Sequence, residues 1–107
     1  MIGGNITGVF ETKTTQKNEI GESISTWGRL YSIVGFLDYM SGDSKYTVHN
    51  AKVQESTHIF VCDYQEIDAK PEESRMVINN KSYDVLLIDN PMELNQHLEI
   101  YLRYRGG

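Results

Sequence analysis

The segment Ser74–Asp89, S-R-M-V-I-N-N-K-S-Y-D-V-L-L-I-D, decides the fold class of this 107-residue chain. Two runs rich in β-branched, aliphatic and aromatic residues flank Asn79-Asn80-Lys81-Ser82. Because asparagine tolerates positive φ, this pattern predicts a β-hairpin closed by a tight turn. Both arms carry apolar residues on both faces, which is typical of strands in the middle of a barrel or sandwich.

Further strands are predicted on both sides of this hairpin. Ile6–Thr15 is read as an edge strand, and polar Gln16–Ser23 as a loop. Thr57–Gln65 has strand character, and in the last strand Leu98, Ile100, Leu102 and Tyr104 share one face. The chain is therefore predicted to be one all-β domain over residues 1–107: a small barrel or sandwich of five to six mainly antiparallel strands, with a long inserted loop over Asp38–Ser56.

Ile24–Leu37 fits a helical face as well as a strand. Gly28 and Gly35, with β-branched and aromatic residues between them, favour the strand. Trp27, near its start, is expected to be a core anchor rather than a platform for a ligand, because tryptophan supplies a large buried area to a small domain.

Composition limits the function classes. The chain is 39% hydrophobic and 23% charged, as in ordinary globular domains, and its formal net charge of -5 argues against a dedicated nucleic-acid binder. The single cysteine, Cys62, excludes an internal disulfide. There is neither a signal-peptide pattern nor an apolar run of about 18 residues, so we expect synthesis in the cytosol and no membrane insertion.

Residues that could perform chemistry are not grouped in the sequence. His49, His58 and His97 lack the spacing of metal ligands, and Cys62 lies in an apolar strand where burial makes a thiol inert. There is no glycine-rich phosphate loop, and the carboxylates lie mainly in loops and at strand ends. We therefore predict no enzyme activity, no cofactor and no metal site.

From Trp27 to the C-terminus the sequence resembles the phage head-tail joining family, the head-completion, head-closure or stopper proteins of long-tailed bacteriophages. The resemblance depends on the order and spacing of several elements, because no single one is specific. A tryptophan precedes an aromatic-aliphatic strand, threonine-histidine opens the next strand, and an arginine opens the following one. A tyrosine-led strand then ends near an aspartate. The residues are Trp27, Thr57, His58, Arg75, Tyr83 and Asp89.

The resemblance implies a structural virion protein that forms a homo-oligomeric ring below the portal or adaptor protein. Such a ring closes the DNA-filled capsid, lies close to packaged double-stranded DNA and offers a platform to a tail protein. The expected location is the head-tail connector of the virion, and the host cytoplasm during assembly. The inserted loop is expected to make assembly or channel contacts through Asp43, Lys45, Tyr46, His49, Lys52, Gln54 and Glu55.

Two other functions remain open from the sequence. One is a tail-terminator or another tail component. The other is an oligonucleotide-binding barrel that stacks bases on tyrosines of its strands. The tyrosines in question are Tyr31, Tyr64, Tyr83, Tyr101 and Tyr104.

Overall fold

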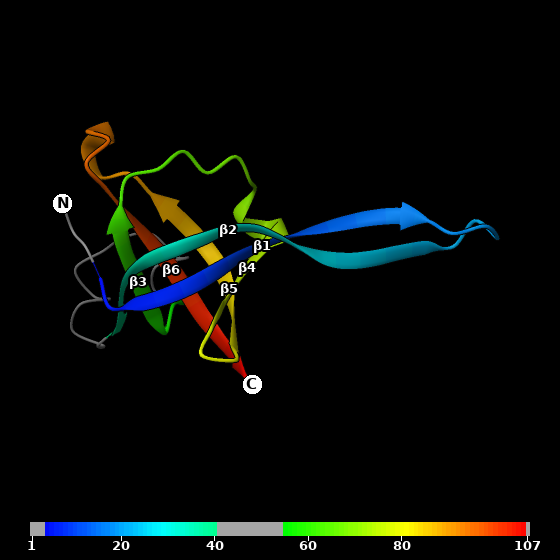
Figure 1. The fold of residues 1–107 in the computed structure, drawn as a ribbon, viewed down its shortest axis with the longest axis horizontal. Helices are drawn as coiled ribbons and strands as arrows, with labels where there is room; N and C mark the ends of the chain where they lie inside the picture. The colour runs from blue at the N-terminus through cyan, green and yellow to red at the C-terminus, as the bar shows by residue number, and fades with distance from the viewer. Residues whose placement is uncertain (1–3, 41–54, 107) are drawn as a thin grey trace.

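A computed structural model describes residues 4–40 and 55–106, which form a closed barrel of six antiparallel strands (Figure 1). The predicted all-β class is confirmed, and the barrel is the alternative observed. Around the barrel the strands follow the order β1-β2-β3-β6-β5-β4. Their bounds are β1 Ile6–Lys17, β2 Ser23–Tyr39, β3 His58–Asp63, β4 Ser74–Ile78, β5 Lys81–Asp89 and β6 His97–Gly106, with 3-10 turns at Pro71–Glu73 and Pro91–Glu93.

The β4–β5 hairpin is present as predicted. Asn79 and Asn80 have φ of 52° and 64°, and Ile78 pairs with Lys81 across them. Two central residues with positive φ make the tight turn whose twist matches that of the flanking strands. The turn therefore needs only the two asparagines, and Lys81 and Ser82 belong to β5.

The core is built from alternate residues of every strand. In β6, Leu98, Ile100 and Leu102 are buried as predicted, whereas Tyr104 at the end of the strand is exposed. Burial of apolar area at about 25 cal/mol per Å² is the main force that holds such a barrel together. The buried hydrophobic residues are Phe10, Ile33, Phe60, Cys62, Met76, Ile78, Tyr83, Val85, Leu98, Ile100 and Leu102.

The prediction that β1 is an edge strand is wrong. Residues 9–12 of β1 pair with β4 while the opposite side of the strand pairs with β2, so β1 closes the barrel. β4 lies far along the chain, and its pairing with β1 leaves no local pattern in the sequence. The second half of β1 pairs with β2 alone.

Residues 13–27 form a two-stranded ribbon that projects from the barrel, and we call this ribbon the arm (Figure 1). It gives the molecule principal extents of 50 × 28 × 27 Å. The expected loop over Gln16–Ser23 is therefore shorter, because β1 continues to Lys17 and β2 begins at Ser23. Trp27 pairs with Lys13 in the arm and is 40% exposed, so its prediction as a core anchor is also wrong.

Cys62 is fully buried in β3, as expected. Burial raises the pKa of its thiol to about 11, and the Asp63 carboxylate adds to the rise. Because the thiolate is the reactive form, native protein at pH 8 should react with an aromatic disulfide reagent far more slowly than protein in urea. Equal rates in both conditions would contradict the buried position of the thiol.

Candidate functional site: assembly surfaces

The residues that could support catalysis stay apart in the structure. Among residues 4–40 and 55–106, no group of three or more His, Cys, Asp or Glu side chains is placed to hold a metal ion. His97 contacts Glu99 at 3.2 Å, and His58 lies among aromatic rings. Over the same residues, no helix has the length and apolarity needed to cross a bilayer.

The base of the arm is fixed by Trp27, Arg75 and Glu11. The Arg75 guanidinium lies 4.4 Å from the centre of the Trp27 ring, and its Nε donates to Glu11 Oε1 at 2.7 Å. An arginine that stacks on an aromatic ring and pairs with a carboxylate has few alternative orientations. Two of the residues that carried the family resemblance, Trp27 and Arg75, therefore hold the arm on the barrel.

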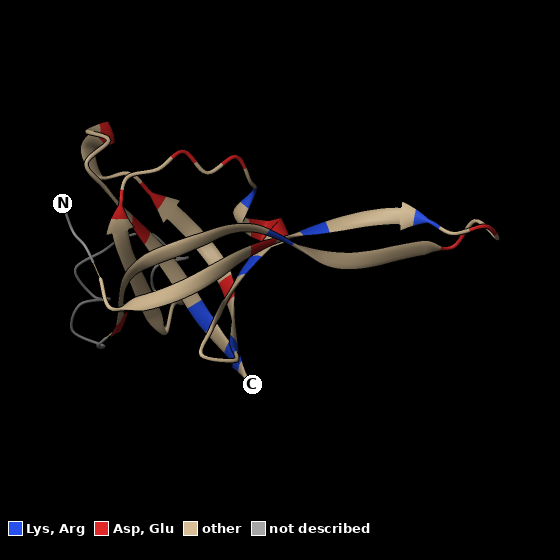
Figure 2. Ribbon diagram, viewed as in Figure 1, with Lys and Arg blue, Asp and Glu red and all other residues tan. Residues whose placement is uncertain are grey.

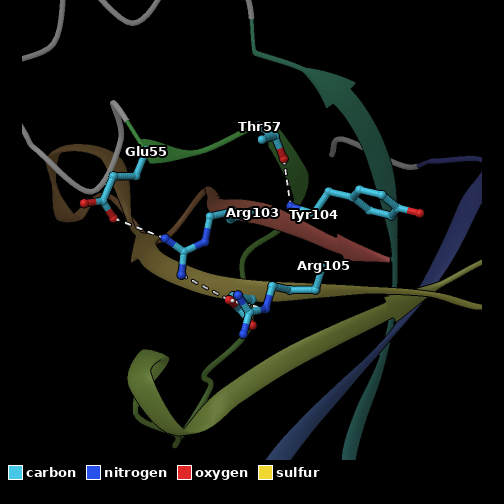
Figure 3. A network of polar contacts seen from close by, with 6 residues as sticks. Glu55, Thr57, Arg103, Tyr104 and Arg105 are labelled. Atoms are coloured by element: carbon cyan, nitrogen blue, oxygen red, sulfur yellow. Dashed lines mark hydrogen bonds and ion pairs between the residues drawn. The ribbon is translucent and has the colours of Figure 1, made fainter. Parts of the chain in front are cut away.

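Thr57 fixes the place where the chain returns from the 41–54 segment. Its backbone carbonyl accepts from Met40 N at 2.9 Å, and its backbone N–H donates to Leu102 O at 2.8 Å. Its hydroxyl oxygen accepts from Tyr104 N at 2.8 Å (Figure 3). The same oxygen lies 2.8 Å from His58 Nδ1. The two ends of the inserted segment are thus bonded to each other and to β6.

An aromatic cluster surrounds His58 beside this anchor. The His58 ring lies edge-on to Tyr39 and Tyr83, at centroid distances of 5.4 and 5.1 Å, and Tyr104 lies 6.4 Å away. Tyr83 is buried, while Tyr39 is 73% exposed. Three of the family-pattern residues, Thr57, His58 and Tyr83, therefore stabilise the base of the inserted segment.

His58 should make the stability of the barrel depend on pH. Burial lowers the pKa of His58, Lys81 adds to the shift, and the unfolded chain titrates near the ordinary value of about 6.5. The contribution of the neutral ring is complete above about pH 6.5 and is lost as the pH falls toward the folded-state pKa. Urea melts should show that His58→Gln reduces the loss of stability between pH 7.5 and pH 5.5; an unchanged pH dependence would contradict this.

A second network holds Glu55 at the end of the inserted segment. Asp84 accepts from Arg103 Nη2 at 3.2 Å and from Arg105 Nε at 3.1 Å, and Arg103 Nη1 lies 3.6 Å from Glu55 Oε2 (Figure 3). Of the loop residues predicted to make contacts, Glu55 is the one that the structure describes. The others lie outside the described residues: Asp43, Lys45, Tyr46, His49, Lys52 and Gln54. The predicted loop over Asp38–Ser56 begins too early, because β2 continues to Tyr39.

A cleft of about 390 Å³ separates the base of the arm from β5. Trp27 and Lys13 line the arm side of the cleft, and Leu86, Asp84 and Arg103 line the barrel side. Leu86 is the extra residue where the β5–β6 register shifts, between Val85 and Leu87. The bulge therefore places an apolar side chain in the cleft rather than in the core.

Acidic residues gather on the connections at one end of the barrel (Figure 2). Residues 63–73 and 89–99 contain eight carboxylates and a single lysine, Lys70. Asp89, the last family-pattern residue, lies at this end of the barrel. It is part of neither the base of the arm nor the base of the inserted segment. Burial raises the pKa of Tyr101 to about 12. The hydrogen bond to Glu99 and the negative charges of Glu99 and Asp89 add to the rise. The acidic end disfavours contact with a polyanion.

The five tyrosines considered for base stacking do not form one platform. Tyr83 is buried, Tyr31 packs against Phe10, and Tyr101 donates to Glu99. Tyr64 follows β3 at the acidic end, whereas Tyr104 lies near the C-terminal end of β6, at the opposite end of the barrel. Sequence reasoning missed the arm because its strands lack apolar alternation. It missed the Arg103–Asp84–Arg105 network because that network depends on the register between β5 and β6.

Comparison with known proteins adds a family and a fold. Residues 8–103 match the family of phage head completion proteins. A solution structure of protein SF1141 from Shigella flexneri 2a is similar at a TM-score of 0.77, with 14% identity, covering 97% of this chain and 95% of that one. At this identity the likeness shows the fold alone. No curated protein matches the chain.

Proposed function

Since this chain belongs to the phage head completion protein family and has a structural role in the phage head, we propose that it closes the DNA-filled head as a ring. The ring lies below the portal or adaptor protein and presents a platform to the tail. The observation that carries the proposal is the family match over residues 8–103. The resemblance found in the sequence points to the same family. The ring, its neighbours and its location in the virion are what that resemblance implies.

The architecture is consistent with a connector. A barrel that satisfies its own backbone hydrogen bonds leaves only its projections and its outer face for partners. The base of the arm and the ends of the segment 41–54 are both fixed by family-pattern residues. The acidic end suits a conduit, because DNA passes such a surface without adhering to it.

Residues 44–54 are proposed to contact a neighbouring connector component. Replacing Ser44–Gln54 with a short Gly/Ser linker should leave the barrel folded, because the Met40–Thr57 hydrogen bond and the Thr57 anchor lie outside the exchange. Heads with this variant should lose DNA or fail to join tails. Circular dichroism checks that the barrel is folded, and the yield of infectious phage checks the loss of function. A Gly/Ser replacement of native length is the control, because it keeps the length of the segment and removes its side chains. A normal yield of infectious phage with the short linker would refute the proposed contact.

Electron microscopy tests the function directly. An epitope fused after Gly107, detected on DNA-filled heads, should label the one vertex where the tail attaches. Label on the tail tube or tail end would instead favour a tail component. A titration with single-stranded DNA at low salt should give no shifted band, since Tyr64 and Tyr104 lie at opposite ends of the barrel and the chain has a formal net charge of -5.

A further inference from the structure

Two exposed apolar surfaces lie on opposite sides of the barrel. In a closed ring of six strands, β2 and β5 are three positions apart in either direction. Ile33 and Gly35 point inward from β2, so Val34 and Phe36 point outward and are 54% and 45% exposed. Phe36 pairs with Val61 of β3. We call these three outward residues, Val34, Phe36 and Val61, the β2 patch.

The second surface is the cleft between the arm and β5. Its apolar lining includes Trp27 and Leu86. Since one copy carries the patch and the cleft on opposite sides, the two surfaces of one molecule cannot meet each other. They are, however, arranged so that the patch of one copy can enter the cleft of the next.

We propose that the arm clasps the β2 patch of a neighbouring copy, which makes this the lateral contact of the ring; the inference rests on the ring of the proposed function. Different patches on opposite sides of a subunit give a head-to-tail interface, and such an interface closes into a ring when the rotation allows it. The partner that fits the cleft is therefore a second copy of this chain.

The apolar match lies at the bottom of the cleft. Trp27 already stacks on Arg75, so its ring is held in place before a partner arrives. A preordered tryptophan loses little conformational freedom on binding, and such residues dominate interface energies. Val34 and Phe36 provide a flat apolar surface of matching chemistry on the partner.

The charge match continues outward from the apolar contact. Lys13 lies opposite Trp27 and Lys17 opposite Ser23, so both lysines share the Trp27 face of the arm. The other face carries Thr14 and Thr26, joined by a 3.1 Å hydrogen bond between their hydroxyl groups. On the partner, β3 runs from the patch into the connection that carries exposed Glu66 and Asp68. Glu72 and Glu73 line the same hollow as Lys13, so Lys17, farther out on the arm, is the lysine that faces the partner's carboxylates.

The arm also needs a partner for its own stability. Residues 13–17 and 19–27 are all exposed, including Ile20 at 78% and Ile24 at 46%. A two-stranded ribbon without a hydrophobic face is only marginally stable in water. With a rise of about 3.4 Å per residue the arm extends roughly 20 Å beyond its last pairing with β4, which compares with a shortest extent of 27 Å for the molecule.

Cross-linking tests this contact in the purified full chain. The double variant Lys13→Cys/Val34→Cys, at high protein concentration with a short bismaleimide, should give a ladder of dimers, trimers and larger species. Each single-cysteine variant should give no ladder, because the lysine site and the valine site meet only each other. The native Cys62 is buried and stays unmodified.

A control variant keeps the cysteine at position 13 and places the second cysteine at the other end of the barrel. Lys81 is exposed at the start of β5, and Lys13→Cys/Lys81→Cys should give no ladder. Trp27→Ala in the Lys13→Cys/Val34→Cys background should abolish the ladder and lower the melting temperature only slightly, because Trp27 lies outside the core and its removal costs only the contact with Arg75. Absence of a ladder, or equal ladders from both cysteine pairs, would overturn the contact.

The same variants separate this contact from the proposed function. A specific ladder in purified protein, together with absence of the chain from the head-tail junction, would support the contact and refute the connector role. Label at the junction, with no specific ladder in purified protein or in heads, would refute the contact and leave the connector role standing.

Discussion

Gly35→Ala is expected to destabilise the barrel by about 3 kcal/mol, the upper part of the range for overpacking in a closed core. Gly35 lies in the middle of β2, where it pairs with Ile6 of β1 and Cys62 of β3. A Cβ at this position would clash with the backbone carbonyl oxygen of Val61 and lie 2.8 Å from the Phe60 ring. Backbone on one side and a fully buried ring on the other leave no direction in which the strand can relax.

Two other glycines are matched controls for this substitution. A Cβ at Gly28 would meet nothing closer than Thr12 O at 4.0 Å, so Gly28→Ala should be close to neutral. A Cβ at Gly8 would lie 2.5 Å from the terminal methyl of Met76, a flexible group that can move, so Gly8→Ala should have an intermediate cost. Urea melts of the three variants give the order. Equal stability of the Gly35 and Gly28 variants would contradict the assigned register.

The strands that the sequence predicts well are those whose signal is local. The Asn79–Asn80 turn and the alternation in β6 each follow from residues that are neighbours in the chain. The second partner of β1 could not be predicted, since Val9 pairs with Val77, which lies far along the chain. Pairing between distant segments depends on packing and leaves no periodic pattern.

The arm was missed because its sequence lacks apolar alternation. Its strands are held by cross-strand pairs such as Thr14–Thr26 and Thr15–Ser25, polar contacts that resemble a loop in composition. Trp27 was assigned to the core on size alone. Arg75 stacks on the Trp27 side chain outside the core and pairs with Glu11. Both residues lie in other segments of the chain.

The family-pattern residues were predictable as a set, but their roles were not. Their spacing carries the resemblance, and the structure divides them into an anchor for the arm, an anchor for the inserted segment, and Asp89 at the acidic end. The role of each residue depends on which side chains meet in three dimensions, and the register between strands determines these contacts.

Tyr83 and Leu86 illustrate the limit most clearly, because the sequence assigns both to the centre of the hairpin. The structure separates them: Tyr83 is 4% exposed and packs on His58, whereas Leu86 sits at the bulge and lines the cleft. Removing a buried aromatic side chain leaves a cavity that costs about 3–5 kcal/mol. Truncation at a partly exposed bulge should cost about 1 kcal/mol or less.

The expected result is therefore a large loss of stability for Tyr83→Ala and a small one for Leu86→Ala. Tyr83→Phe is the control, since it keeps the ring that packs on His58 and Tyr104 and removes only the hydroxyl group. Chemical denaturation of the three variants measures the difference. Because Leu86 lies in the cleft, its alanine variant should instead weaken the cross-linking between Lys13→Cys and Val34→Cys. A Leu86→Ala variant as unstable as Tyr83→Ala would place the bulge elsewhere and remove Leu86 from the cleft.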